Sequence, residues 1–186
     1  LQLLQLDGRL RAAVFFCEKI AHMTTDIQAR LREAERLHAA GEFARAESAF
    51  SALLADDPDS PYLHLRLSEA RQSLGQYRDA RAAALAAEAG MRRTDRWQAL
   101  PYVTMRLLAF DERQLMKRAI TSADWSKPEV LTQAPVLSQH LWLSGGYDEA
   151  IDLIDRTMQR AHPSALLHYS RANALRYGGR IDEATE

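Results

Sequence analysis

The sequence predicts an all-α fold, a superhelix of helical hairpins with one irregular repeat in the middle. Three observations support this prediction. The hexapeptide 75–80 has counterparts at 41–46, 145–150 and 179–184, and two of the intervals are 34 residues long. Apolar residues recur every three or four positions between these hexapeptides, as on one face of a helix. Glycines stand at the start of each hexapeptide, and a fixed period of this size is typical of helical repeat arrays.

The composition is that of an ordinary soluble globular protein. Hydrophobic residues make up 47% and charged residues 26% of the chain. Lys and Arg total 24 against 25 for Asp and Glu, so no overall field attracts nucleic acid or an anionic membrane. The single Cys17 can form neither an internal disulfide nor a thiolate metal cluster, so we expect a reducing compartment, the cytoplasm.

Residues 1–26 are expected to be an N-terminal helix or a leader, and three interpretations stay open. The apolar run 12–17 is too short to cross a bilayer, which needs about 20 residues. The run could belong to an amphipathic helix that packs on the array, or to a translated leader upstream of a natural start at Met23. A signal peptide is the third interpretation, because Arg9 and Arg11 precede the run, although no small-residue cleavage site follows it.

Residues 27–94 are expected to form two regular hairpins. Gly41 and Gly75 separate the two helices of each hairpin, where the chain needs a left-handed or sharply turned residue. Ala46 and Ala80 stand at matching positions of the two units. A large side chain there would push the helices of a hairpin apart, so both alanines are predicted to be buried at close helix contacts.

The segment 95–130 is expected to be a degenerate hairpin. The turn glycines on either side of it are 70 residues apart, which is two periods of 34 plus two residues. Its helices are predicted at 95–109 and 111–122, with Phe110 and Asp111 in place of the glycine turn. We expect this hairpin to interrupt the regular superhelix.

The repeat period and the residues at the turns resemble the tetratricopeptide repeat family. The family pattern has a small residue at position 8, Gly near 15, an aromatic at 17, Ala at 20, a large apolar residue at 24 and Pro at 32. The first unit matches this pattern with Ala34, Gly41, Phe43, Ala46, Phe50 and Pro58. The resemblance covers most of residues 27–186 and implies a solenoid in which residues 131–186 hold two further units, the last one truncated.

The resemblance also implies a binding surface for a protein or peptide partner on the concave face. In this family, positions 2, 5, 9, 12 and 13 of each first helix face the groove. Transferred to this chain, these positions supply the candidate partner-binding residues Tyr62, Glu69, Gln139, Trp142, Tyr169, Asn173, Arg176 and Tyr177. The four candidates of the last unit could hydrogen-bond to an extended peptide and stack on it.

One known mode of peptide recognition is not expected here. Family members that hold the C-terminal carboxylate of a chaperone tail use Lys at position 5 and Asn at position 9. This chain has Leu31 with Glu35 in the first unit and Leu65 with Glu69 in the second. The resemblance therefore implies that the clamp is absent and that the two glutamates would repel a carboxylate.

The sequence contains no catalytic or cofactor signature. It has no phosphate-binding glycine loop followed by Lys and Ser or Thr, no HExxH motif and no paired cysteines. The six histidines are scattered and are expected to be structural or solvated, and the basic run between 92 and 118 is expected to be a solvated helical face. Of the tryptophans, Trp97 is predicted to be in the core and Trp125, in a loop, to be the most exposed.

The prediction is therefore a noncatalytic scaffold that binds a protein or peptide, without a cofactor, a metal, nucleic acid or a membrane. A second resemblance leaves an enzyme open as the alternative. The stretch 167–184 looks like the repeats that precede the catalytic domain of bacterial repeat-containing sulfotransferases. This likeness covers about 20 residues and brings no catalytic residue, and the catalytic domain would lie beyond Glu186.

Overall fold

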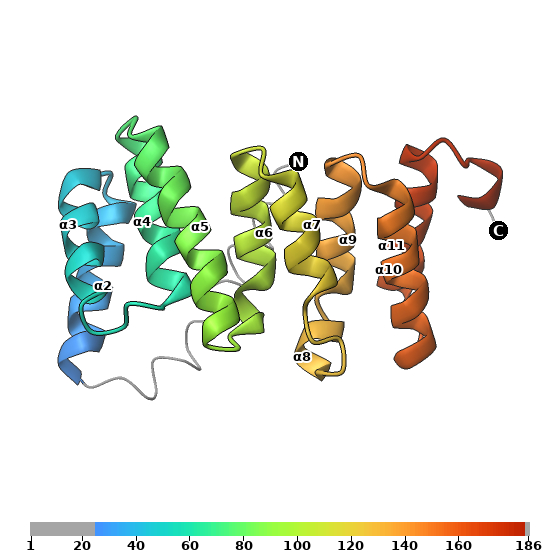
Figure 1. Ribbon diagram of the computed structural model, residues 1–186, viewed down its shortest axis with the longest axis horizontal. Helices are drawn as coiled ribbons and strands as arrows, with labels where there is room; N and C mark the ends of the chain where they lie inside the picture. Colours follow the sequence, from blue (N-terminus) through green and yellow to red (C-terminus); the bar gives the residue numbers. More distant parts are fainter. Residues whose placement is uncertain (1–24, 185–186) are drawn as a thin grey trace.

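The computed structural model describes residues 25–184, and this part of the chain is helical throughout its regular structure, without a β-strand (Figure 1). The helices stand side by side in one row, from α2 at one end to α11 at the other. The first two hairpins are α2 (Thr25–Ala39) with α3 (Phe43–Leu53), and α4 (Pro61–Ser73) with α5 (Tyr77–Arg93). The predicted all-α superhelix of hairpins is confirmed.

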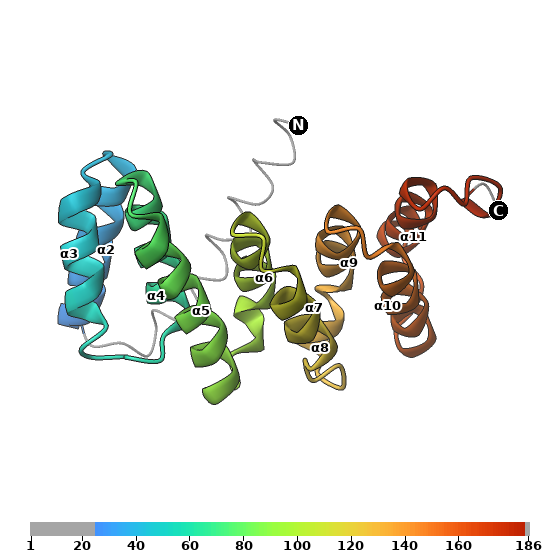
Figure 2. The ribbon, with the colours of Figure 1, turned by 45° about the horizontal axis from the view of Figure 1, so that its top comes forward.

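The middle and the end of the row follow the same succession (Figure 2). A short 3-10 helix, η1 (Trp97–Ala99), leads into α6 (Leu100–Ala109), which pairs with α7 (Arg113–Thr121). The last elements are α8 (Pro128–Leu131), α9 (Ala134–Leu143), α10 (Tyr147–Arg160), α11 (Ala165–Tyr177) and η2 (Asp182–Ala184). The expectations for residues 1–22 lie outside the described residues.

The hairpin turns owe their shape to glycines in the left-handed region. Gly41, Gly75, Gly145 and Gly179 have φ between 75° and 84°. At the second of these turns, the amide after the glycine donates to the carbonyl of Arg71 at 2.9 Å, five residues back. This bond occupies a carbonyl that the end of α4 would otherwise leave without a partner.

The third hairpin makes the same turn with an aspartate. Asp111 has φ 58°, and the following amide of Glu112 donates to the Leu107 carbonyl at 2.9 Å. The glycine is absent, as the sequence indicates, but the conformation that glycine favours is kept. The helix α6 packs against α5 on one side and α9 on the other, so the row continues through this hairpin. The extra length of the middle unit lies in the α7–α9 connection, which contains α8.

Small and apolar side chains fill the contacts between helices. Ala46 and Ala80 are fully buried, as predicted from the need for close approach. Trp97 is buried in the core, also as predicted. Trp125 is different: it is only partly exposed, it packs against the core, and its Nε1 donates to the Ile120 carbonyl at 2.9 Å. The prediction that the loop would leave Trp125 exposed is wrong, because the loop folds back on α7.

Candidate functional site

The eight candidate residues lie on the first helices of three hairpins. Tyr62 and Glu69 are on α4, Gln139 and Trp142 are on α9, and the other four are on α11. The helices α9 and α11 pack against each other, whereas α6 stands between α4 and α9 in the row (Figure 1). The structure therefore brings together the candidates of the last two units and leaves those of α4 in a separate group.

Arg66 lies at the centre of the group on α4 and links the first two hairpins. Its Nη2 is 3.0 Å from Oε2 of Glu35 on α2, and its Nη1 donates to Oε2 of Glu69 at 2.7 Å. Arg106 extends the contacts to α6, because its Nη2 is 2.8 Å from Oε1 of Glu69 and its Nη1 donates to Oε1 of Gln72 at 2.5 Å. Two arginines and two glutamates thus neutralise one another across three helices.

Tyr62 belongs to the same group of contacts. Its hydroxyl donates to the Glu35 carboxylate, and the guanidinium carbon of Arg66 is 5.4 Å from the centre of its ring. Burial raises the pKa of the Tyr62 hydroxyl, so this group stays a neutral donor. The charge network, as we call it, consists of Glu35, Tyr62, Arg66, Glu69, Gln72 and Arg106.

Burial and charge oppose each other at Glu69. Burial on its own would raise the pKa of this carboxyl, but the guanidinium groups of Arg66 and Arg106 outweigh it and hold the pKa below its usual value. The glutamates at position 9 are thus ionised but paired, and the prediction that they would act as bare repelling charges is wrong. Leu31 and Leu65 at position 5 are buried in the core.

Aromatic rings dominate the second group. Trp142 and Tyr177 stack with ring centres 4.5 Å apart and an angle of 9° between the planes. The guanidinium carbon of Arg176 is 5.4 Å from the centre of the Tyr177 ring. Tyr169 is 66% exposed and lies two turns before Tyr177 on the same helix. We call Trp142, Tyr169, Arg176 and Tyr177 the aromatic shelf.

Two polar candidates flank the aromatic shelf. Asn173 lies between Tyr169 and Tyr177 on α11, and Gln139 lies one turn before Trp142 on α9. Both side chains are half-buried, and within residues 25–184 neither makes a side-chain hydrogen bond. Arg176 likewise has no carboxylate within 4 Å in that part of the chain. The shelf therefore combines exposed aromatic faces with polar groups that have no bonding partner in the described residues.

A buried histidine joins the two groups. His140 on α9 is 1% exposed, and its Nδ1 is 2.8 Å from Oγ1 of Thr104 on α6. Its Nε2 is buried without a hydrogen-bond partner among the described residues. Desolvation lowers the pKa of His140 to about 4, so the ring is neutral at physiological pH. The expectation of a structural role fits this side chain.

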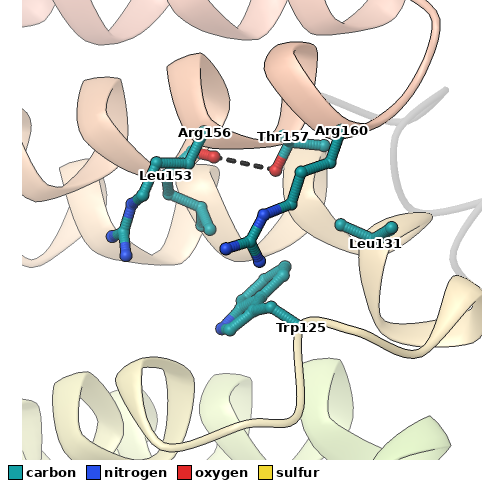
Figure 3. A pocket seen from close by; sticks show the side chains of 6 residues that line it. All are labelled: Trp125, Leu131, Leu153, Arg156, Thr157 and Arg160. Carbon is teal, nitrogen blue, oxygen red and sulfur yellow. Dashed lines mark hydrogen bonds between the residues drawn. The ribbon is translucent and has the colours of Figure 1, made fainter.

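The structure also contains a pocket that sequence reasoning missed. Its lining comes from the loop after α7, from α8 and from α10, and consists of Trp125, Leu131, Leu153, Arg156, Thr157 and Arg160 (Figure 3). The available signal was the two-residue excess between the turn glycines of the second and fourth units, which marks the segment where α8 departs from the repeat.

Within the described residues, no set of three His, Cys, Asp or Glu side chains is placed to hold a metal ion. In the same part of the chain, every helix is too short or too polar to cross a membrane. Both observations concern residues 25–184.

Fold and turns together define a solenoid of helical hairpins, the class in which each unit contacts its neighbours along a row. Residues 37–100 match the family described as tetratricopeptide repeat. Together with the fold, this match shows that the chain is a tetratricopeptide repeat protein. Repeats of this family generally mediate protein–protein interaction. Neither finding tests the alternative that these repeats precede a sulfotransferase domain, which stays a prediction.

Solved structures of the same type support the fold. The repeats of a protein assigned as a kinesin light chain from Podosopora anserina are 15% identical to this chain, with a TM-score of 0.62 and coverage of 88% of this chain and 92% of that one. The MamA protein is 20% identical, with a TM-score of 0.58 and coverage of 88% of each chain. The C-terminal part of a TPR repeat-containing protein from Cytophaga hutchinsonii is 19% identical, with a TM-score of 0.53 and coverage of 82% and 60%. The comparison with curated proteins gave no match.

Proposed function

We propose that this chain is a noncatalytic scaffold that binds a partner protein by holding an extended peptide segment on its first-helix face, at the aromatic shelf. The observation that carries the proposal is the Trp142–Tyr177 stack beside an exposed Tyr169 and an Arg176 that has no carboxylate partner in the described residues. Aromatic and arginine side chains that are exposed together are the usual energetic centre of a protein interface. A cytoplasmic location is part of the proposal and rests on the single cysteine.

The chemistry of the shelf indicates the kind of segment it would hold. Ring faces bury apolar or aromatic side chains, and a guanidinium group binds a carboxylate through charge-assisted hydrogen bonds. Asn173 and Gln139 can donate to and accept from a peptide backbone that runs along the helices. The proposed ligand is therefore an extended segment in which an apolar or aromatic residue lies close to an acidic one.

The charge network argues against the same role for the first two units. Tyr62 and Glu69 are already bonded to Arg66, Glu35 and Arg106, so a ligand would have to break contacts between helices in order to use them. The loss of those contacts would offset most of the gain from new ones. We therefore restrict the proposed site to α9 and α11.

The test is selection of ligands from a displayed library of random peptides, with the full chain as bait. We expect the selected peptides to combine an aromatic or apolar residue with Asp or Glu. Fluorescence anisotropy should then show that Tyr177→Ala weakens binding at least tenfold, in line with the loss of an interface hot spot. A matched control is Tyr77→Ala on α5, since Tyr77 is also a highly exposed tyrosine near a helix end.

Two results would overturn the proposal. One is a library that yields no enriched peptide although the bait is folded by circular dichroism. The other is a set of peptides whose affinity is the same for the wild type, Tyr177→Ala and Arg176→Gln. Peptides that bind the wild type but respond to Glu69→Gln instead would move the site to the charge network.

A further inference from the structure

The pocket between α8 and α10 is separate from both groups of candidate residues. It shares no side chain with the charge network or the aromatic shelf, which are built from first helices. Its walls are Trp125 from the loop after α7, Leu131 from α8, and four side chains of α10, namely Leu153, Arg156, Thr157 and Arg160. It lies where the middle of the chain departs from the repeat, so the regular pattern does not account for it.

The walls of the pocket are held in place by local hydrogen bonds. The indole Nε1 of Trp125 donates to the Ile120 carbonyl at 2.9 Å, which fixes the orientation of the ring. Before it, Oδ1 of Asp124 accepts from the amide and the hydroxyl of Ser126 at 3.1 and 2.5 Å, which closes the loop. A ligand would therefore meet a ring that is already positioned, and little ordering would be needed on binding.

The charges around the pocket leave one arginine without a counter-ion. Arg156 donates to Oδ2 of Asp152 at 2.5 Å, whereas Arg160 has no carboxylate within 4 Å in residues 25–184. Asp155, the next acidic residue on α10, is bonded to Arg171 at 2.7 Å. None of the six lining residues is acidic. In Figure 3 both arginines extend from α10 toward the side of the pocket where the Trp125 ring lies.

The size of the pocket limits what it can hold. Its volume of about 160 Å³ is below the range of roughly 300–1,000 Å³ typical of small-molecule and cofactor sites. It suits one amino-acid side chain. The indole and the two leucines favour an apolar side chain, and Arg160 beside them favours a carboxylate next to that side chain.

We propose that this pocket binds an acidic peptide segment of a partner protein, in which an apolar side chain packs on Trp125 and an adjacent carboxylate pairs with Arg160. Arg156 lies on the same side of the pocket and adds a second guanidinium group, already paired with Asp152. This proposal does not rest on the aromatic shelf. A partner that used both sites would contact the last two units from two directions.

The smallest probe with both features is N-acetyl-leucine, which carries an apolar side chain and a free carboxylate. We would titrate it into the full chain and follow the side-chain N–H signals of tryptophan and arginine by NMR. The Trp125 and Arg160 signals should shift with a dissociation constant on the order of a few millimolar, as expected for a ligand of this size. The signals of Trp97 and Trp142 should stay in place.

Two controls separate the carboxylate from the apolar contact. N-acetyl-leucinamide, which lacks the carboxylate, should bind about fivefold more weakly, the effect of losing one exposed ion pair. Arg160→Gln should remove this difference between the two probes, and because the side chain is exposed the variant should keep its fold. Arg78→Gln on α5, an exposed arginine without an ion pair in the described residues, should change nothing.

Three outcomes would overturn the proposal. The first is the absence of any shift of Trp125 with N-acetyl-leucine. The second is equal affinity for the acid and the amide. The third is an equal response to inorganic phosphate at the same concentration, because the pocket would then be a general anion site and not a site for a peptide.

Discussion

The two ends of the first-helix face use similar residue types in opposite ways. In the charge network, the arginines and the tyrosine bond to glutamates of neighbouring helices and hold three hairpins together. In the aromatic shelf, Arg176 and Tyr177 lie on the last described helix and bond to no carboxylate in the described residues. The comparison teaches that a position in the repeat does not decide between stability and binding, because the neighbouring helices decide it.

The largest expected effect is a pH-dependent loosening of the joint between the two regions, at His140. The folded pKa of about 4 is below the ordinary 6.5, so the folded state binds fewer protons. The stabilising contribution is complete above pH 6.5 and is lost as the pH falls toward 4. The free energy of unfolding should fall by up to about 3 kcal/mol over this range.

Denaturant unfolding at several pH values measures this loss. The variant His140→Phe should flatten the pH dependence between 6.5 and 5, where Glu69 remains ionised because its pKa is lowered. The exposed His168→Gln is the matched control and should leave the dependence unchanged. An unchanged dependence in His140→Phe would show that the buried ring is not the titrating group.

The second effect concerns the charge network. The variant Arg66→Met leaves Glu35 and Glu69 without their shared partner, and we expect the free energy of unfolding to fall by about 2 kcal/mol, less than for a fully buried pair. The control Arg36→Met breaks the exposed Arg36–Glu33 pair and should cost under about 0.5 kcal/mol. Equal losses in the two variants would mean that the network does not stabilise the array.

The third effect separates stability from binding at the stack. The variant Trp142→Ala removes the contact with Tyr177, and we expect a loss of about 1 kcal/mol in the free energy of unfolding. Affinity for a selected peptide should fall at least tenfold. A large loss of stability without a loss of affinity would place Trp142 with the core and not with the shelf.

The smallest effect is expected at Arg176. Because its side chain is exposed and has no ion pair in the described residues, Arg176→Gln should change the free energy of unfolding by less than about 0.5 kcal/mol. Affinity for an acidic peptide should still fall several-fold, and more so at low salt. If Arg176→Gln destabilised the chain as much as Arg66→Met, the contrast between the two regions would fail.

Much of the fold could be predicted from local features of the sequence. The 34-residue period, the turn glycines and the buried alanines depend on contacts within one hairpin, so the chain order alone indicates them. The prediction for Trp125 was wrong for the opposite reason. Its environment depends on how a loop folds against α7 and α10, and no period in the sequence describes that loop.

The sequence by itself determined the hairpins, their register and the list of side chains that face one side of the row. These follow from backbone preferences and apolar spacing, which act over a few residues. Only the tertiary structure decided which of those side chains are engaged. Tyr62 and Glu69 meet partners 27 and 37 residues away in the chain, while Arg176 and Tyr169 meet none of that kind in the described residues. Pairing between charges depends on distance in space, and that distance is set when the helices pack.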